Sequence, residues 1–201
     1  MKIKKNLLIL GIIFVIIGII LSVIYKEPHF YAWFSLGLFI ILITIYNSIS
    51  EKPLFYKWKI KKYFIFLGIL ILTCIIIDKI GIYLNYWTYL YNTLFDEVLK
   101  YMFEWAVAFL YFMVILLVGM KIFQKNRLGK TISFVLSLII FVTITGLITE
   151  YINQFVGSWI VLNMPLTNYK IRGYYLIFQT IGYWLMAIIP LIIYKFVNKI
   201  K

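Results

Sequence analysis

Long apolar stretches recur along the chain, and short polar segments separate them. Six stretches reach about 20 mainly apolar residues, the length needed to cross a hydrocarbon core of about 30 Å. We place them at residues 7–25, 30–49, 63–82, 101–121, 131–150 and 174–194. Each is apolar around its whole circumference and too long for a barrel strand, so each is predicted to be a helix. The pattern predicts an all-α fold, a polytopic transmembrane bundle of six helices forming a single domain over residues 1–201.

The distribution of charge adds an orientation to this bundle. The net charge is +13, but Lys and Arg occur in small groups at the ends of the spans, which argues against nucleic acid as a partner. Of the 20 basic residues, 15 lie on the side of the bundle that carries the two termini. The positive-inside rule places this side in the cytoplasm. We therefore expect a multi-pass protein of the cell membrane, with membrane lipids as partners and both termini cytoplasmic.

The acidic residues have the opposite distribution. Six of the seven carboxylates fall on the side away from the termini, and Asp78, Glu104 and Glu150 lie near span ends. Neighbouring helix positions point about 100° apart, so we expect Asp78 to turn inward and Lys79 outward. Carboxylates within a membrane usually face the bundle interior and mark a functional site.

Structural roles for the same carboxylates remain open at this stage. Asp78 is a candidate partner for Lys100 or Arg172, and Glu104 and Glu150 are close enough to span ends to be solvated.

A weak repeat connects two of these acids. Asp78 precedes Trp87 by nine residues, and Glu150 precedes Trp159 by nine. Each pair leaves a helix that runs from the terminal side to the far side of the bundle. The repeat predicts two related hairpins, residues 63–125 and 131–196, although the two stretches are otherwise dissimilar.

The order of residues over about 75–125 resembles the small membrane-embedded lycopene cyclase domains of carotenoid synthesis. An acid near a span end is followed by an aromatic link with a Trp nine residues on, and then by a span that opens with Tyr101-Met102-Phe103-Glu104-Trp105. Phe109, Tyr111 and Phe112 follow, and a fainter echo covers 147–190. The chain departs from the family pattern, which usually has a Pro and two adjacent acids where this chain has only Glu104 after Phe103.

The resemblance implies a cyclase that acts on a polyene end group without redox change and without a cofactor. Such a site needs a proton donor and groups that tolerate a carbocation. The resemblance implies Glu104 as acid or base, Asp78 as its electrostatic partner and Glu150 as the counterpart in the second repeat. The residues expected to line the ligand pocket are Tyr101, Trp87, Trp105 and Trp159.

A second function is also compatible with the sequence. A small transporter, permease subunit or partner-binding membrane protein would use the outer carboxylates to attract a cation or basic group, with Asn153 beside Glu150 as a ligand contact. The sequence leaves open which function applies, whether the protein is an enzyme, and whether a homo- or hetero-oligomer completes the site. His29 is the single histidine and lies in a short turn, so we expect a surface role and no metal site.

Overall fold

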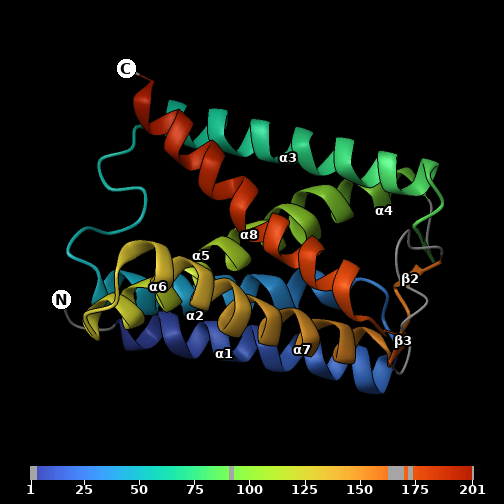
Figure 1. The fold of residues 1–201 in the computed structure, drawn as a ribbon. Helices are drawn as coiled ribbons and strands as arrows, with labels where there is room; N and C mark the ends of the chain where they lie inside the picture. The colour runs from blue at the N-terminus through green and yellow to red at the C-terminus, as the bar shows by residue number, and fades with distance from the viewer. Residues whose placement is uncertain (1–3, 91–92, 163–169, 172–173, 201) are drawn as a thin grey trace.

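Six long helical segments run back and forth in the structure, which is a computed structural model describing residues 4–90, 93–162, 170–171 and 174–200 (Figure 1). All six are long and apolar enough to cross a membrane. This confirms the membrane-spanning helices predicted from the apolar pattern. Both described ends of the chain lie at one end of the bundle.

Three of the six segments change from α-helical to π-helical winding along their length. The helices are α1 (Lys5–Ile20) with η1 (Leu21–Tyr25), α2 (Phe30–Ile49), α3 (Ile60–Tyr83), α4 (Leu94–Leu99) with η2 (Lys100–Trp105) and α5 (Ala106–Lys125), α6 (Lys130–Ser137) with η3 (Leu138–Val142) and α7 (Thr143–Asn153), and α8 (Leu176–Lys199). The elements η1, η2 and η3 are single wide turns, a form that is rare and often found at functional sites.

The fourth segment begins at Leu94, earlier than the predicted start at 101. Thr93 forms a capping box: its hydroxyl accepts a hydrogen bond from the backbone N–H of Asp96, and the Asp96 carboxylate accepts from the backbone of Thr93. Side-chain oxygens that satisfy the first free N–H groups let a helix begin in a polar stretch. Hydropathy alone does not detect such a start, because residues 94–100 include three charged side chains.

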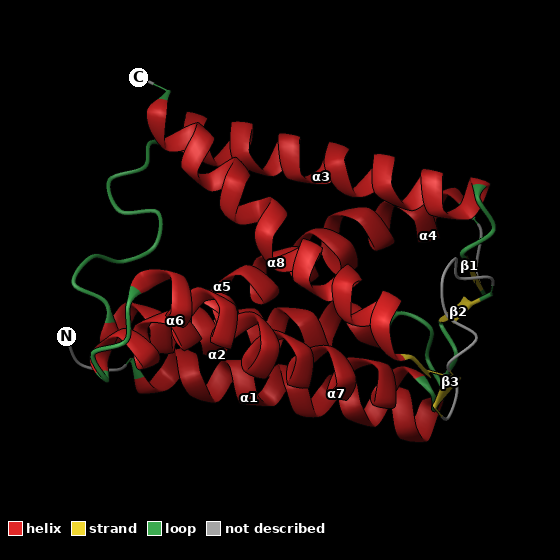
Figure 2. Ribbon diagram, viewed as in Figure 1, coloured by secondary structure: helices red, strands yellow, loops and turns green. Residues whose placement is uncertain are grey.

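Short strands, which the all-α prediction did not include, close the end of the bundle opposite the termini (Figure 2). Strand β1 (Trp87–Tyr89) pairs antiparallel with β2 (Trp159–Val161), so that Trp87 faces Val161 and Tyr89 faces Trp159. Strands β3 (Lys170–Ile171) and β4 (Tyr174–Tyr175) form a second pair. We call the end that carries β1 and β2 the ribbon end.

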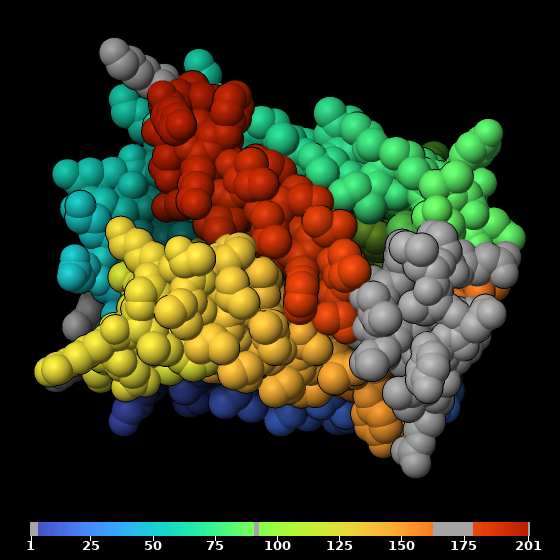
Figure 3. Space-filling view, in the orientation of Figure 1, coloured from blue at the N-terminus to red at the C-terminus, as the bar shows by residue number. Residues whose placement is uncertain are grey.

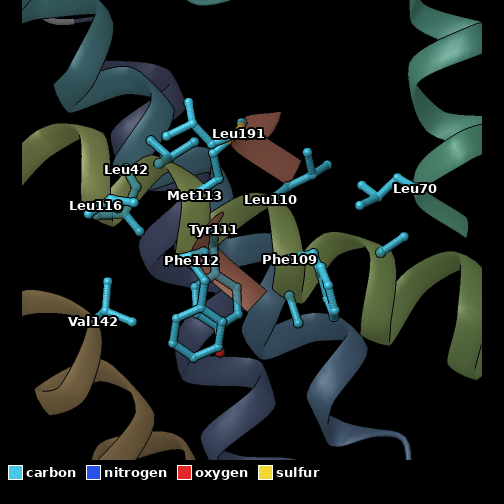
Figure 4. Packing of buried hydrophobic residues seen from close by; sticks show 14 of the residues in the cluster. Leu42, Leu70, Phe109, Leu110, Tyr111, Phe112, Met113, Leu116, Val142 and Leu191 are labelled. Carbon is cyan, nitrogen blue, oxygen red and sulfur yellow. The ribbon is translucent and has the colours of Figure 1, made fainter. Parts of the chain in front are cut away.

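Helix α5 lies at the centre of the bundle and packs against α2, α3, α6 and α8. Its side chains are buried along most of its length, whereas the other helices expose wide apolar faces. Figure 4 shows the core around it, with Phe109, Leu110, Tyr111, Phe112, Met113 and Leu116 from α5 meeting Leu42, Leu70, Val142 and Leu191 from its neighbours. Exposed apolar faces are the surfaces that lipid chains cover in a membrane.

Helices α3 and α8 are held together near the C-terminal end of α8. Trp58 lies just before the start of α3, and its indole stacks on Tyr194 of α8. The indole N–H also donates to Asn198 Oδ1 of α8 at 2.6 Å. From there the two helices diverge toward the ribbon end, as the ribbon and space-filling views show (Figures 1 and 3). Residues of both helices line a cavity on this side.

Candidate functional site

Asp78 is fully buried near the end of α3, and its carboxylate is enclosed by hydrogen-bond donors. The Trp87 indole N–H and the Tyr89 hydroxyl donate to Oδ1 at 2.9 and 2.6 Å. The Tyr101 hydroxyl and the Lys100 ammonium approach Oδ2 at 2.7 and 3.1 Å. Four donors therefore hold the two oxygens, and the charge is neutralised by a lysine that is itself buried.

Helix geometry places Asp78 inside the bundle and Lys79 outside, as expected. The Lys79 side chain is half exposed and pairs with Glu97. Lys100 reaches Asp78 from η2 and also lies over the rings of Tyr89 and Tyr101, at 3.9 and 4.7 Å from their centroids. Of the two basic partners considered for Asp78, the structure shows Lys100, and Arg172 lies outside the described residues.

Glu150 is buried near the end of α7 in a similar set of contacts. Its Oε1 accepts from the Trp159 indole at 3.2 Å and from the Tyr183 hydroxyl of α8. Gln179 and Asn153 are further hydrogen-bonding neighbours of this carboxylate. Asn153 also donates to the Trp159 carbonyl at 3.0 Å, which fixes the start of β2.

The two buried carboxylates are held in corresponding ways. In each case an indole nine residues later donates to the carboxylate, and a tyrosine from the next membrane segment donates as well. The antiparallel pairing of β1 with β2 joins the two links. The halves differ in charge, because Lys100 neutralises Asp78 whereas the described donors around Glu150 are neutral side chains.

Glu104 comes from the wide turn η2, and only 2% of its side chain is exposed. Its Oε1 lies 2.9 Å from Nδ1 of His29, and Nε2 of the same ring lies 3.0 Å from Oδ1 of Asp96. His29 therefore bridges two carboxylates from the fourth membrane segment. The side chain of His29 is 20% exposed, so it reaches the surface as expected, but its contact with the buried Glu104 was not expected; it forms because α2 packs against η2.

Sequence reasoning missed His29 because its partners lie 67 and 75 residues away. The only signal was its position in a turn on the side where the acids gather. Among the described residues, no group of three or more His, Cys, Asp or Glu side chains is arranged to hold a metal ion.

The contact with Glu104 raises the pKa of His29 from its usual 6.5 to about 9, with Asp96 adding to the effect. Because the folded pKa exceeds the unfolded one, the stabilisation by the imidazolium is complete below pH 6.5 and is lost as pH rises through about 9. The sequence contains a single histidine, so NMR of histidine-labelled protein observes only the imidazole of His29. We expect its chemical shift, followed as pH is raised, to give a titration midpoint near pH 9. Glu104→Gln should lower this midpoint more than Asp96→Asn does. A midpoint near 6.5 in the unmodified protein would contradict the bridge.

A cavity of about 500 Å³ lies between these groups and α8. Both Glu104 and Glu150 line it. Its aromatic wall consists of Tyr31, Tyr86, Trp87, Tyr89, Trp105, Phe109, Trp159 and Tyr183. Several of these rings support one another: Trp105 stacks on Phe109, and Tyr31 meets Trp159 edge to face with centroids 5.0 Å apart. The cavity therefore combines rigid aromatic walls with two buried carboxyl groups.

The lipid side of the cavity is apolar. Ile80 of α3 and Ile181 and Leu185 of α8 line it, and about half of each of these side chains is exposed. These exposed lining residues indicate that the cavity opens between α3 and α8, toward the region that lipid chains would occupy.

The structure brings together five of the eight side chains predicted for the site. Glu104, Glu150, Trp87, Trp105 and Trp159 line the cavity. Asp78, Tyr101 and Asn153 do not line it: Asp78 holds Trp87 and Asn153 holds Trp159, which do, and Tyr101 holds Asp78. Tyr31, Tyr183 and Gln179 also line it and were not predicted, because long-range packing of α2 and α8 places them there.

Comparison of the chain with protein-family models, with curated proteins and with solved structures found no match.

Proposed function

We propose that this chain is an integral membrane protein that binds the end of a hydrophobic, isoprenoid-type ligand in the cavity and acts on it by acid–base chemistry. The observation that carries the proposal is the pair of buried carboxyl groups, Glu104 and Glu150, within a wall of aromatic rings. Apolar pockets with a few convergent polar groups are typical ligand sites, and about 300 to 1,000 Å³ is their usual volume.

The opening between α3 and α8 favours a lipid-soluble ligand over a water-soluble one. Apolar side chains form the rim, and a long ligand could keep the rest of its chain in the bilayer while its end enters the cavity. The charge distribution supports a cytoplasmic location for both termini in the cell membrane, which would put the ribbon end and the cavity on the outer side.

The chemistry proposed is cyclisation of a polyene end group, as the resemblance to lycopene cyclase domains implies. Glu104 gives a proton to a terminal carbon–carbon double bond, which leaves a carbocation. A second double bond of the ligand attacks this cation, so a carbon–carbon bond forms and the positive charge moves into the ring. Loss of a ring proton to Glu150 then restores a double bond, and the ligand is isomerised without gain or loss of electrons.

The aromatic wall supports chemistry through a carbocation, because ring faces attract a cation. Asp78, which the resemblance makes an electrostatic partner, already has Lys100 as its counter-ion. We assign Asp78 the role of positioning Trp87 and Tyr89 in the cavity wall.

The proposal is tested by pigment chromatography of lycopene-accumulating bacteria that express the chain. We expect the unmodified protein to form a cyclic product. Glu104→Gln or Glu150→Gln should lower the amount of this product by about 100-fold or more. Glu97→Gln is the matched control, because Glu97 lies on the same membrane segment but pairs with the surface residue Lys79. It should leave product formation unchanged.

Equal amounts of membrane-inserted protein must be confirmed for all four chains. Unchanged lycopene with abundant, inserted, unmodified protein would overturn the cyclase chemistry. Co-purified lipid bound in the cavity would then favour a ligand-binding or transport function.

A further inference from the structure

The chain of contacts from Asp96 through His29 to Glu104 leads from the surface of the protein to the cavity. The side chains of Asp96 and His29 are 16% and 20% exposed, whereas that of Glu104 is 2% exposed and lines the cavity. Asp96 and His29 thus reach solvent at the ribbon end, and Glu104 does not. Protons that reach Glu104 from solution have a continuous hydrogen-bonded route through the imidazole.

The number of protons on this chain follows from the two contacts. Each ring nitrogen lies within hydrogen-bond distance of a carboxylate oxygen, so each contact needs one proton. An imidazolium between two carboxylates meets this condition. So does a neutral imidazole that donates to Asp96 and accepts from a protonated Glu104. The two arrangements hold the same protons and differ only in which atom of the Nδ1–Oε1 contact carries one.

We infer that His29 is the proton-transfer residue that recharges Glu104 from the surface. From the imidazolium, the Nδ1 proton moves to Oε1 of Glu104, and Glu104 passes it to the ligand in the cavity. Glu104 is then ionised, and the ring is neutral and keeps its Nε2 proton. When the ring turns its free nitrogen toward the ribbon end, that nitrogen takes a proton from solution and the imidazolium is restored. The inference rests on the proposed role of Glu104 as the acid of the cavity.

Further charged side chains lie on the two segments that carry these contacts. Glu27 precedes it on the same turn, and its Oε1 lies 3.4 Å from the backbone N of His29. On the facing fourth segment, Glu97 pairs with Lys79 and Lys100 pairs with Asp78, which leaves Asp96 and Glu104 as the carboxylates on the ring. The raised pKa of His29 keeps the imidazolium loaded at neutral pH.

The inference is tested by the rate of product formation in membranes containing the unmodified protein, His29→Ala or Glu27→Gln. We expect His29→Ala to be slower by about 100-fold, the lower end of what a positioned proton donor contributes, and added imidazole to restore much of the rate. Substituted imidazoles should rescue in an order that follows their pKa, which a purely structural role for His29 would not produce. Glu27→Gln, which changes a carboxylate on the same turn, should match the unmodified protein.

The outcomes separate this inference from the proposed function. Product formed at an unchanged rate by His29→Ala would overturn the relay and leave the function standing, and a slow variant that no imidazole rescues would also overturn it. If the unmodified protein forms no product, the function fails. The relay is then tested without substrate, by NMR of the two ring nitrogens of the single histidine in the labelled protein. Both must be protonated at neutral pH, and Glu104→Gln and Asp96→Asn must each change the signal of the nitrogen they face; unaltered signals would overturn it.

Discussion

Replacing Lys100 by Met is expected to lower the free energy of unfolding by about 3 to 5 kcal/mol, because it leaves a fully buried carboxylate without its counter-ion. Asp78 has no exposed surface, and Lys100 lies 3.1 Å from its Oδ2. The remaining donors, two tyrosines and a tryptophan, are neutral. Unfolding of the purified protein in mixed detergent micelles, followed by circular dichroism, measures the loss.

Two further variants identify the cause of this loss. Lys100→Met combined with Asp78→Asn should recover much of the stability, since no uncompensated charge remains. Lys79→Met is the matched control: Lys79 follows Asp78 directly, but its ion pair with Glu97 is solvent-exposed, and such pairs contribute about 0 to 1 kcal/mol. A Lys100→Met protein as stable as the Lys79→Met protein would show that the buried ion pair does not hold this end of the bundle together.

Replacing Gly37 by Leu is expected to cost about 3 kcal/mol, the upper end for overpacking, because the obstacle is backbone. A Cβ atom at Gly37 would lie 2.6 Å from the Val15 nitrogen and 2.7 Å from the Gly11 carbonyl oxygen. In return, a Cβ at Gly11 would lie 3.0 Å from the Gly37 carbonyl oxygen and 3.1 Å from the Ile41 backbone nitrogen. Neither helix can relieve these contacts by turning a side chain, so α1 and α2 would have to move apart. Close approach through small residues is a common way to pack helices in membranes.

Gly68→Leu provides the matched control for this substitution. Gly68 lies inside α3, and no atom lies within 4 Å of where its Cβ would be. The same change there should be neutral or slightly stabilising, because Leu favours a helix more than Gly does. The same detergent unfolding assay, with crosslinking between cysteines introduced into α1 and α2, distinguishes helix separation from a general loss of stability. Equal effects at positions 37 and 68 would contradict the backbone-contact explanation.

The candidate site was predictable where it depends on local geometry. Asp78 turns inward and Lys79 outward because residues adjacent on a helix point in different directions. The nine-residue spacing of each acid and Trp was visible in the sequence, and both indoles donate to those acids. The predicted repeat of residues 63–125 and 131–196 remains a prediction, with these matching contacts as its support.

The rest of the site depends on residues that meet only after the helices have packed. Nothing local distinguishes Asp78 from Glu150, yet Lys100 neutralises the first and neutral donors surround the second. In the sequence, His29 is only a residue of a short turn. The packing of α2 against η2 places it between Asp96 and Glu104. Nothing in the sequence connects Gly11 with Gly37. Only the packing of α1 against α2 brings the two glycines into contact.

The sequence by itself determined that the chain forms six helices long and apolar enough to cross a membrane, because span length and hydropathy are properties of single segments. It also determined that the acids gather at one end, since alternating spans assign each link to a side. Only the tertiary structure decided which carboxyl groups line a cavity, which one is held by a lysine, and which one is linked to the surface through His29. These are contacts between segments, and they depend on the rotation of each helix and on its closest neighbours, which hydropathy does not encode.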